Sequence, residues 1–325
     1  MSTEENCILS VENLQVSFRT DEGEFPILRG LSYTLPTGRI LAVVGESGSG
    51  KTVHALALLR LLPPAAHITG GKVIYQGKDI VHLTKKELRN IRGGKISMIF
   101  QDPSASLNPV LTIGEQLTET ILAHKKITKQ VAQKQAAALL EKVGIRESEK
   151  RLQEYPFQFS GGMCQRVMIA MALALKPDVL IADEPTTALD VTIQAQILRL
   201  MRDLQKESGM SAIFITHNLA VVAGVADEVL VLYGGLCMEQ AEVNELFASP
   251  LHPYTQGLLK SLVSVDKKKD RLPAIEGQPP IPSEIGKGCP FAPRCTQALP
   301  ICFEQCPPLT VKGTHRVRCW LQEGK

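Results

Sequence analysis

Residues 40–52 read ILAVVGESGSGKT, and this stretch decides the fold. Its first five residues are apolar, and a turn signal follows them at once. Such a run predicts a strand that is buried on both faces of a parallel sheet. The glycine-rich loop that follows fits the pattern G-x-x-x-x-G-K-[ST], which belongs between a strand and a helix. The stretch therefore predicts an α/β fold.

The glycine-rich loop carries groups suited to binding the phosphates of a nucleotide. Glycine lets the backbone curl so that several N–H groups face one anion, and the next helix adds the positive end of its dipole. Lys51 is expected to reach the β- and γ-phosphates, and the Thr52 hydroxyl to hold Mg²⁺. A chance glycine-rich turn is the alternative, and the predicted strand and helix on either side argue against it. The predicted binding residues are Gly45, Glu46, Ser47, Gly48, Ser49, Gly50, Lys51 and Thr52.

A second short apolar run, residues 179–182, is followed by Asp183 and Glu184. In open α/β sheets, ligands bind at the carboxyl ends of the strands. Asp183 is therefore expected to hold Mg²⁺, directly or through water, while Glu184 orients and deprotonates the attacking water. An ordinary solvated strand end is the alternative, and the phosphate loop in the same chain favours the catalytic interpretation.

The remaining sequence predicts how the α/β core is interrupted and extended. The first two strands are assigned to an N-terminal antiparallel β subdomain, and a helical insertion is expected over about residues 103–178. Strands resume after the insertion, so the core sheet is expected to be mainly parallel. The predicted strands are 8–18, 27–35, 40–44, 179–182, 212–216 and 229–233, and the predicted helices are 52–62, 113–124, 129–143, 163–174 and 194–207.

Two domains are expected, an ATP-binding domain over residues 1–264 and a C-terminal extension over 265–325. The extension opens with a charge run at 266–270 and is rich in proline and cysteine, so little regular structure is expected in it. Five of the eight cysteines lie between Cys289 and Cys319. In a cytosolic chain, such a cluster indicates metal binding before disulfides.

Composition excludes several classes of protein. With 325 residues, 44% hydrophobic and 21% charged, the chain can bury a full core and is not disordered as a whole. A net charge of +3 gives no reason to expect nucleic acid as a partner. The longest apolar run, residues 167–175, is far shorter than the ~20 residues that cross a bilayer. The first residues, MSTEENC, show no signal peptide, so a cytosolic location is expected.

Six ordered motifs over about residues 40–220 resemble those of the nucleotide-binding subunit of an ABC transporter. Two have been described, the phosphate loop and the Asp183–Glu184 pair. The others are Gln101 after an apolar strand, the signature Ser160-Gly161-Gly162, the sequence Ala188-Leu189-Asp190 and His217 after Ile215-Thr216. The signature departs from the commonest form at Phe159 and Met163 only, and its Ser-Gly-Gly is intact.

The resemblance implies roles for these residues. Glu184, His217 and Gln101 are the expected catalytic residues, and Thr52, Gln101 and Asp183 the expected Mg²⁺ site. Phe18 is expected to stack on adenine, with a core strand residue as the alternative. The resemblance also implies a head-to-tail pair of cassettes, in which the signature of one closes on ATP held by the other. The further expected ATP contacts are Gln101, Asp183, Ser160, Gly161, Gly162 and Asp190.

The sequence His252-Pro253-Tyr254-Thr255 and the cysteine-rich tail resemble the dipeptide, oligopeptide and nickel importer branch of that family. In that branch the tail carries a [4Fe–4S] cluster, which implies Cys289, Cys295, Cys302 and Cys319 as ligands, while Cys306 fits the spacing poorly. Zinc and non-ligating thiols are the alternatives. The branch also implies a second ATPase subunit, two membrane permeases, a substrate-binding protein outside the membrane, and a position on the cytoplasmic membrane face.

Three other functions are alternatives to a peptide importer. A nickel or metal-chelate importer shares the same architecture. A soluble ABC ATPase in translation or DNA repair is disfavoured, because the chain has one phosphate loop, no sustained heptads and no basic stripe. An iron–sulfur redox protein would leave the phosphate loop unexplained.

Overall fold

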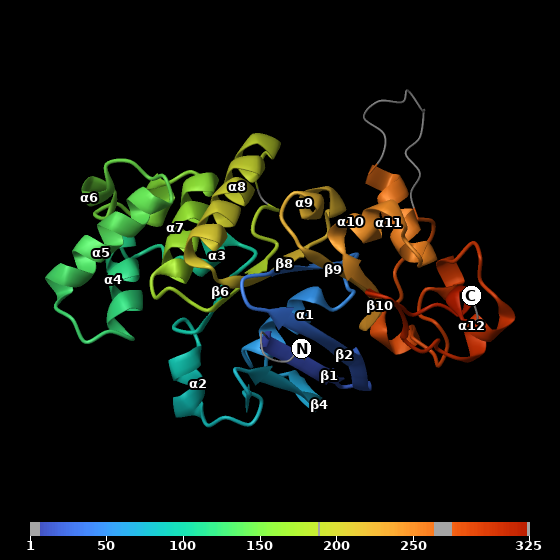
Figure 1. Cartoon of the computed structure of the whole chain (residues 1–325). Coiled ribbons are helices and arrows are strands. Elements are labelled where there is room, and N and C mark those ends of the chain that lie inside the picture. Colours follow the sequence, from blue (N-terminus) through green and yellow to red (C-terminus); the bar gives the residue numbers. More distant parts are fainter. Residues whose placement is uncertain (1–6, 188, 263–274, 324–325) are drawn as a thin grey trace. The chain divides into compact units, whose positions relative to one another are not determined.

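The computed structural model describes residues 7–187, 189–262 and 275–323. The chain divides into two compact units, one of residues 1–81 with 214–325 and one of residues 82–213 (Figure 1). Each unit is described by itself. The predicted charge run at 266–270 and Ala188 lie outside the described residues.

The first unit opens with the predicted antiparallel β subdomain. Strand β1 (Cys7–Thr20) pairs antiparallel with β2 (Gly23–Pro36) and with β4 (Ala66–Tyr75). Residues spaced along β1 are fully buried, which is the alternation that predicted the strand. Strand β4, which adds β5 (Lys78–Asp79) at its far edge, was not predicted. The glycines at 70–71 interrupt its pattern, since Gly71 has a φ of 85° and a Cβ there would lie 2.3 Å from the backbone oxygen of Asn13.

The core strands of the first unit form a mixed arrangement. Strand β3 (Ile40–Val44) is buried at every position, as predicted, and pairs in parallel with β9 (Glu228–Tyr233). Strand β10 (Leu236–Glu242) then pairs antiparallel with β9. The tail adds β12 (His315–Val317), which pairs antiparallel with β10, and β11 (Thr310–Lys312), which pairs antiparallel with β12. The described part of the tail contains only short elements, as expected, but these two strands were not predicted, because three-residue strands leave no periodic signal in a sequence.

A buried acid–base pair holds β12 against β10. Glu239 is fully buried and its carboxylate lies 2.7 Å from Nε2 of His315, which is 3% exposed. The same carboxylate accepts hydrogen bonds from the backbone N–H groups of Leu251 and His252. Burial lowers the pKa of His315, but the hydrogen bond and charge of Glu239 outweigh it, so that the pKa is raised overall. The imidazole and the two backbone N–H groups together provide hydrogen-bond partners for a carboxylate that is buried.

Helix α1 (Lys51–Leu58) follows the phosphate loop directly. It ends earlier than the predicted residue 62, because Arg60 adopts a positive φ of 53° that stops the helix before Pro63. The other helices of this unit are α9 (Leu219–Ala223), α10 (Val243–Ala248), α11 (Pro253–Leu262) and α12 (Pro300–Glu304).

The second unit contains the helical insertion. Strands β6 (Ile96–Ile99) and β7 (Val179–Asp183) pair in parallel. Between them, the described residues form helices and one 3-10 turn but no strand, as predicted (Figure 1). The described helices of the second unit as a whole are α2 (Lys85–Ile91), α3 (Pro103–Ser106), α4 (Ile113–Leu122), α5 (Lys129–Lys142), α6 (Ser148–Arg151), α7 (Gly161–Leu173) and α8 (Val191–Ser208).

Local chemistry explains where these helices begin. Thr112 and Glu115 form a reciprocal capping box at the start of α4, which satisfies two backbone N–H groups. Asp190 caps α8 by accepting 3.0 Å hydrogen bonds from Thr192 and Ile193, so this helix begins before the predicted residue 194. Strand β8 (Ser211–Thr216) crosses the division between the units. None of the described helices combines the length and hydropathy needed to cross a bilayer.

Candidate functional site

The phosphate loop has the shape that an anion cradle requires. A Cβ on Gly45 would lie 2.2 Å from the backbone oxygen of Leu232, so only glycine fits there. Gly48 and Gly50 have positive φ angles of 79° and 103°, and the space beside Gly48 is open. Gly50 is the N-cap of α1 and provides no side-chain acceptor for the N–H groups at the start of the helix. Ser49 Oγ is buried and makes no hydrogen bond within the described part of the chain. The loop therefore fits a phosphate group.

Lys51 lies folded against the loop that it serves. Its side-chain nitrogen donates to the backbone oxygens of Gly45, at 2.8 Å, and Glu46, at 2.9 Å. Lys51 is 6% exposed, and the two carbonyl groups offset part of the cost of burying its charge. Thr52, the next residue, is exposed and so accessible to a metal ion held by phosphate.

Two further predicted contacts lie in the same unit as the phosphate loop. His217 is exposed immediately after β8. Phe18 lies near the end of β1 opposite Phe25 and is only partly buried. A ring with an exposed part remains able to stack on a base. Its predicted contact with adenine stays a prediction.

The second unit brings together the acidic pair and Gln101. Asp183 is 2% exposed at the end of β7. Glu184 follows with a φ of 45°, an uncommon backbone conformation that turns its side chain out of the strand direction. Its Oε2 accepts hydrogen bonds from Gln101 Nε2 at 3.2 Å and from Thr187 Oγ1 at 2.8 Å. The sequence analysis did not predict this role for Thr187. Its position three residues after Glu184 was the feature of the sequence that could have indicated the contact.

The signature sequence begins helix α7. Ser160 is its N-cap and accepts a 3.4 Å hydrogen bond from the backbone N–H of Met163. Met163 thus contributes its backbone N–H here, a contact that does not depend on the identity of its side chain. The other departure, Phe159, is 9% exposed, and the guanidinium of Arg151 lies 5.9 Å from its ring centre. Gly161 and Gly162 open the helix, as an anion-binding N-terminus requires.

The four predicted cluster cysteines, Cys289, Cys295, Cys302 and Cys319, line one small cavity of about 10 Å³. Cys306 does not line it. Burial raises the pKa of the Cys289 thiol to about 12. Within the described residues, no group of three or more His, Cys, Asp or Glu side chains is arranged to hold a metal ion. A cavity of this size holds about one water molecule, so it has no room for the predicted [4Fe–4S] cluster as the side chains stand.

Comparison with known proteins decides the family. The sequence matches the family described as ABC transporter over residues 28–187. It is 52% identical to the oligopeptide transport ATP-binding protein OppD of Bacillus subtilis, over 97% of this chain and 88% of that protein. The chain belongs to the ABC transporter family. It is an ABC-type ATPase with a P-loop NTPase fold, as its motifs predicted.

Residues 238–302 also match the family described as oligopeptide/dipeptide transporter, C-terminal region. This match begins within β10, well before the predicted domain boundary at residue 265. The dipeptide transport ATP-binding protein DppD of Bacillus subtilis is 49% identical over 97% of the chain and 95% of that protein. OppD of Salmonella typhimurium is 46% identical over 96% of the chain and 93% of that protein.

Solved ABC cassettes share the fold. A dimeric ATP-binding cassette in a post-hydrolysis state, bound to ADP and Pi, aligns with a TM-score of 0.65 and 26% identity. The alignment covers 72% of this chain and 98% of that one. CbiO1 of Clostridium perfringens, part of an ABC transporter complex, aligns with the same score over 75% of this chain and 92% of that one, at 27% identity.

Proposed function

We propose that this chain hydrolyses ATP to drive an importer of oligopeptides or dipeptides. The observation that carries the proposal is the C-terminal match to oligopeptide/dipeptide transporters, together with relatives named for peptide transport over nearly the whole chain. These relatives favour peptides over the nickel or metal-chelate cargo and over a soluble ATPase. The proposed division of labour places ATP chemistry in residues 1–264 and a branch-specific function in residues 265–325.

The chemistry needs few groups, because phosphoryl transfer depends on positioning and on neutralising charge. We propose that the phosphate loop binds ATP, that Lys51 leaves its two loop carbonyls to contact the β- and γ-phosphates, and that Phe18 contacts the adenine. Thr52, Gln101 and Asp183 would hold Mg²⁺, which neutralises phosphate charge when bound. Glu184 would take a proton from the attacking water.

The hydrogen bonds of Glu184 support its role as the base. Gln101 and Thr187 both donate to the same carboxylate oxygen, Oε2, which fixes the orientation of the carboxylate. His217, which lies in the same unit as the phosphate loop, would contact the γ-phosphate. Ser160, Gly161, Gly162 and Asp190 would act across a pair of cassettes, on ATP held by the partner.

The proposed partners are a second ATPase subunit, two membrane permeases and a substrate-binding protein outside the membrane. The chain would lie on the cytoplasmic face of the membrane, held by the permeases. A test removes the gene from its native cell and follows uptake of a labelled dipeptide and a labelled pentapeptide. Uptake is expected to fall to background and to return with the wild-type gene but not with Lys51→Ala. Unchanged uptake of both peptides, with intact ATPase activity in the purified chain, would refute peptide import.

We further propose that the four cysteines of the tail form a metal site with [4Fe–4S] as occupant. Their common cavity supports this, and the side chains would have to move apart to admit a cluster. The cluster would act as a staple for a proline-rich segment.

Protein purified without oxygen should therefore contain about four iron and four sulfide per chain. Cys302→Ser should abolish that content, while Cys7→Ser, a matched change in β1, should leave it unchanged. If the purified protein contains zinc and no sulfide, the cysteines form a thiolate zinc site and not an iron–sulfur cluster. A wild-type chain that contains neither metal would end the proposal.

A further inference from the structure

A residue of the C-terminal tail is hydrogen-bonded to the phosphate loop. Arg294 lies in a short 3-10 turn, Ala292–Arg294, and its side chain is only 6% exposed. Its guanidinium donates to both carboxylate oxygens of Glu46, one of them at 3.1 Å. The partners are 248 residues apart in the sequence and lie in the same compact unit. A bidentate arginine–carboxylate pair fixes the relative orientation of the two side chains as well as the distance between them.

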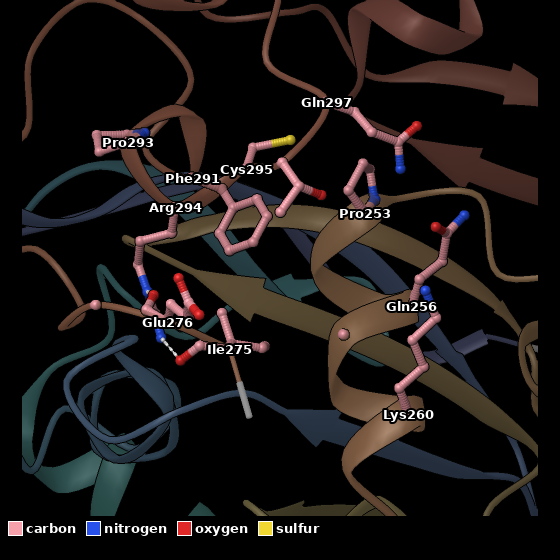
Figure 2. Close-up of a pocket in the computed structure, with 13 residues that line it drawn as sticks. Pro253, Gln256, Lys260, Ile275, Glu276, Phe291, Pro293, Arg294, Cys295 and Gln297 are labelled. Atoms are coloured by element: carbon pink, nitrogen blue, oxygen red, sulfur yellow. Dashed lines mark hydrogen bonds between the residues drawn. The ribbon is translucent and has the colours of Figure 1, made fainter. Parts of the chain in front are cut away.

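The guanidinium is itself held in place from several sides. It donates to the Tyr233 hydroxyl at 3.1 Å and to the backbone oxygens of Ile275 and Glu276 at 3.2 and 2.9 Å. Figure 2 shows Arg294 reaching back to residues 275 and 276 at the wall of a cavity of about 600 Å³. Its donors are thereby largely used, so this arginine is built into the structure and is not a solvated surface charge.

Glu46 is constrained at three points. Its side chain meets Arg294, and its backbone N–H donates to the Tyr254 hydroxyl at 2.9 Å. Its backbone oxygen accepts the hydrogen bond from Lys51. The rings of Tyr233, Tyr254 and Phe291 pack on one another with centroids 4.6–5.3 Å apart, which makes the support behind Glu46 rigid. The tail therefore helps to position Glu46, whose backbone oxygen accepts the hydrogen bond from Lys51.

Charge gives the contact a second consequence. Glu46 lies within a loop built to bind phosphate, where an uncompensated carboxylate would repel the anion. The guanidinium of Arg294 neutralises this carboxylate. Removing the arginine would both loosen the loop and expose ATP to the negative charge.

We propose that Arg294 is a positioning residue for ATP binding, which orients Glu46 and neutralises it and thereby lets the C-terminal extension set the affinity of the phosphate loop. The proposal rests on the proposed function as an ATPase. It assigns the tail an effect on nucleotide binding that is separate from any metal at its cysteines.

The test measures Kd for a fluorescent ATP analogue with Mg²⁺, kcat at saturating ATP and Tm, all on the full chain. Arg294→Gln is expected to raise Kd about tenfold, as the loss of a charge-assisted hydrogen-bonded pair would. The value of kcat should change by less than about twofold, because the contact precedes the chemical step. The Kd of Arg294→Lys should lie between those of the wild type and Arg294→Gln, because lysine keeps the positive charge but cannot form the bidentate contact.

The matched control is Arg318→Gln. Arg318 also ties the tail to the core, through the backbone oxygens of Cys237 and Pro307, but it makes no contact with the phosphate loop. Arg318→Gln should lower Tm and leave the Kd for the ATP analogue within about twofold of the wild-type value. This is the result expected when hydrogen bonds to backbone oxygens are lost away from the site. Equal effects of the two variants on Kd would reduce Arg294 to a structural residue and overturn the proposal.

A second change separates charge from folding. Adding Glu46→Gln to Arg294→Gln removes the uncompensated carboxylate and is expected to recover most of the lost affinity. A double variant that binds no better than Arg294→Gln would contradict the neutralising role. If Arg294→Gln does not fold, Arg294→Lys and Tyr254→Phe carry the test, and wild-type Kd in both would overturn the proposal. Wild-type protein that binds no ATP would instead refute the proposed function.

Discussion

Glu184→Gln is expected to bind ATP as tightly as the wild type but to hydrolyse it about 10²–10⁴ times more slowly, the range typical of losing a general base. The amide has nearly the shape of the carboxylate, so Gln101 and Thr187 can still contact its oxygen. It cannot take the proton from water. Single-turnover hydrolysis and nucleotide binding, measured on the same preparation, separate the two effects.

The control for this variant is Glu207→Gln, which changes an exposed carboxylate on α8 that pairs with Lys142 at 2.8 Å. Its ATPase rate should equal that of the wild type, because surface ion pairs contribute little. Loss of ATP binding in Glu184→Gln, with hydrolysis normalised to bound ATP unchanged, would mean that Glu184 holds Mg²⁺. The roles assigned to Asp183 and Glu184 would then be exchanged.

Lys51→Ala is expected to raise the Kd for ATP about 10- to 100-fold, the cost of one or two charge-assisted contacts. Turnover should fall with it, since the lysine also neutralises charge on the transferred phosphate. The fold should survive with a lowered Tm, because the substitution removes the donor to two backbone carbonyls, of which that of Gly45 is buried. Equilibrium binding and thermal unfolding measure both parts of the prediction.

Lys142→Ala is the matched control for this second change, because Lys142 is an exposed lysine on α5 outside the phosphate loop. It should leave the Kd for ATP unchanged. Wild-type affinity in Lys51→Ala would remove the phosphate loop from the binding site. A large drop in Tm with normal affinity would show that Lys51 stabilises the loop and does not contact ATP.

The four-cysteine prediction shows where a sequence pattern stops short of geometry. The resemblance to the importer branch implied one site for Cys289, Cys295, Cys302 and Cys319, and they do line one cavity. That cavity is too small for a cluster as the side chains stand. Spacing states which thiols can meet, whereas the volume between them depends on how the surrounding loops pack.

The sequence by itself determined the parts of this protein that depend on neighbouring residues. The phosphate loop and its flanking strand and helix lie within residues 40–58, and the acidic pair follows directly on its strand. Such elements are readable because glycine conformation, apolar runs and helix caps act over a few residues. The family motifs follow the same rule, since each is a short string in a fixed order.

Only the tertiary structure decided which distant groups meet. Glu184 with Gln101, Glu239 with His315, and Glu46 with Arg294 join residues 83, 76 and 248 positions apart. No periodicity records these pairs, because each depends on where the chain returns after many intervening elements. A buried charge requires a partner but does not specify its position in the sequence. The folded chain supplies that partner, and in this protein it brings the arginine of a proline-rich tail to the loop that binds phosphate.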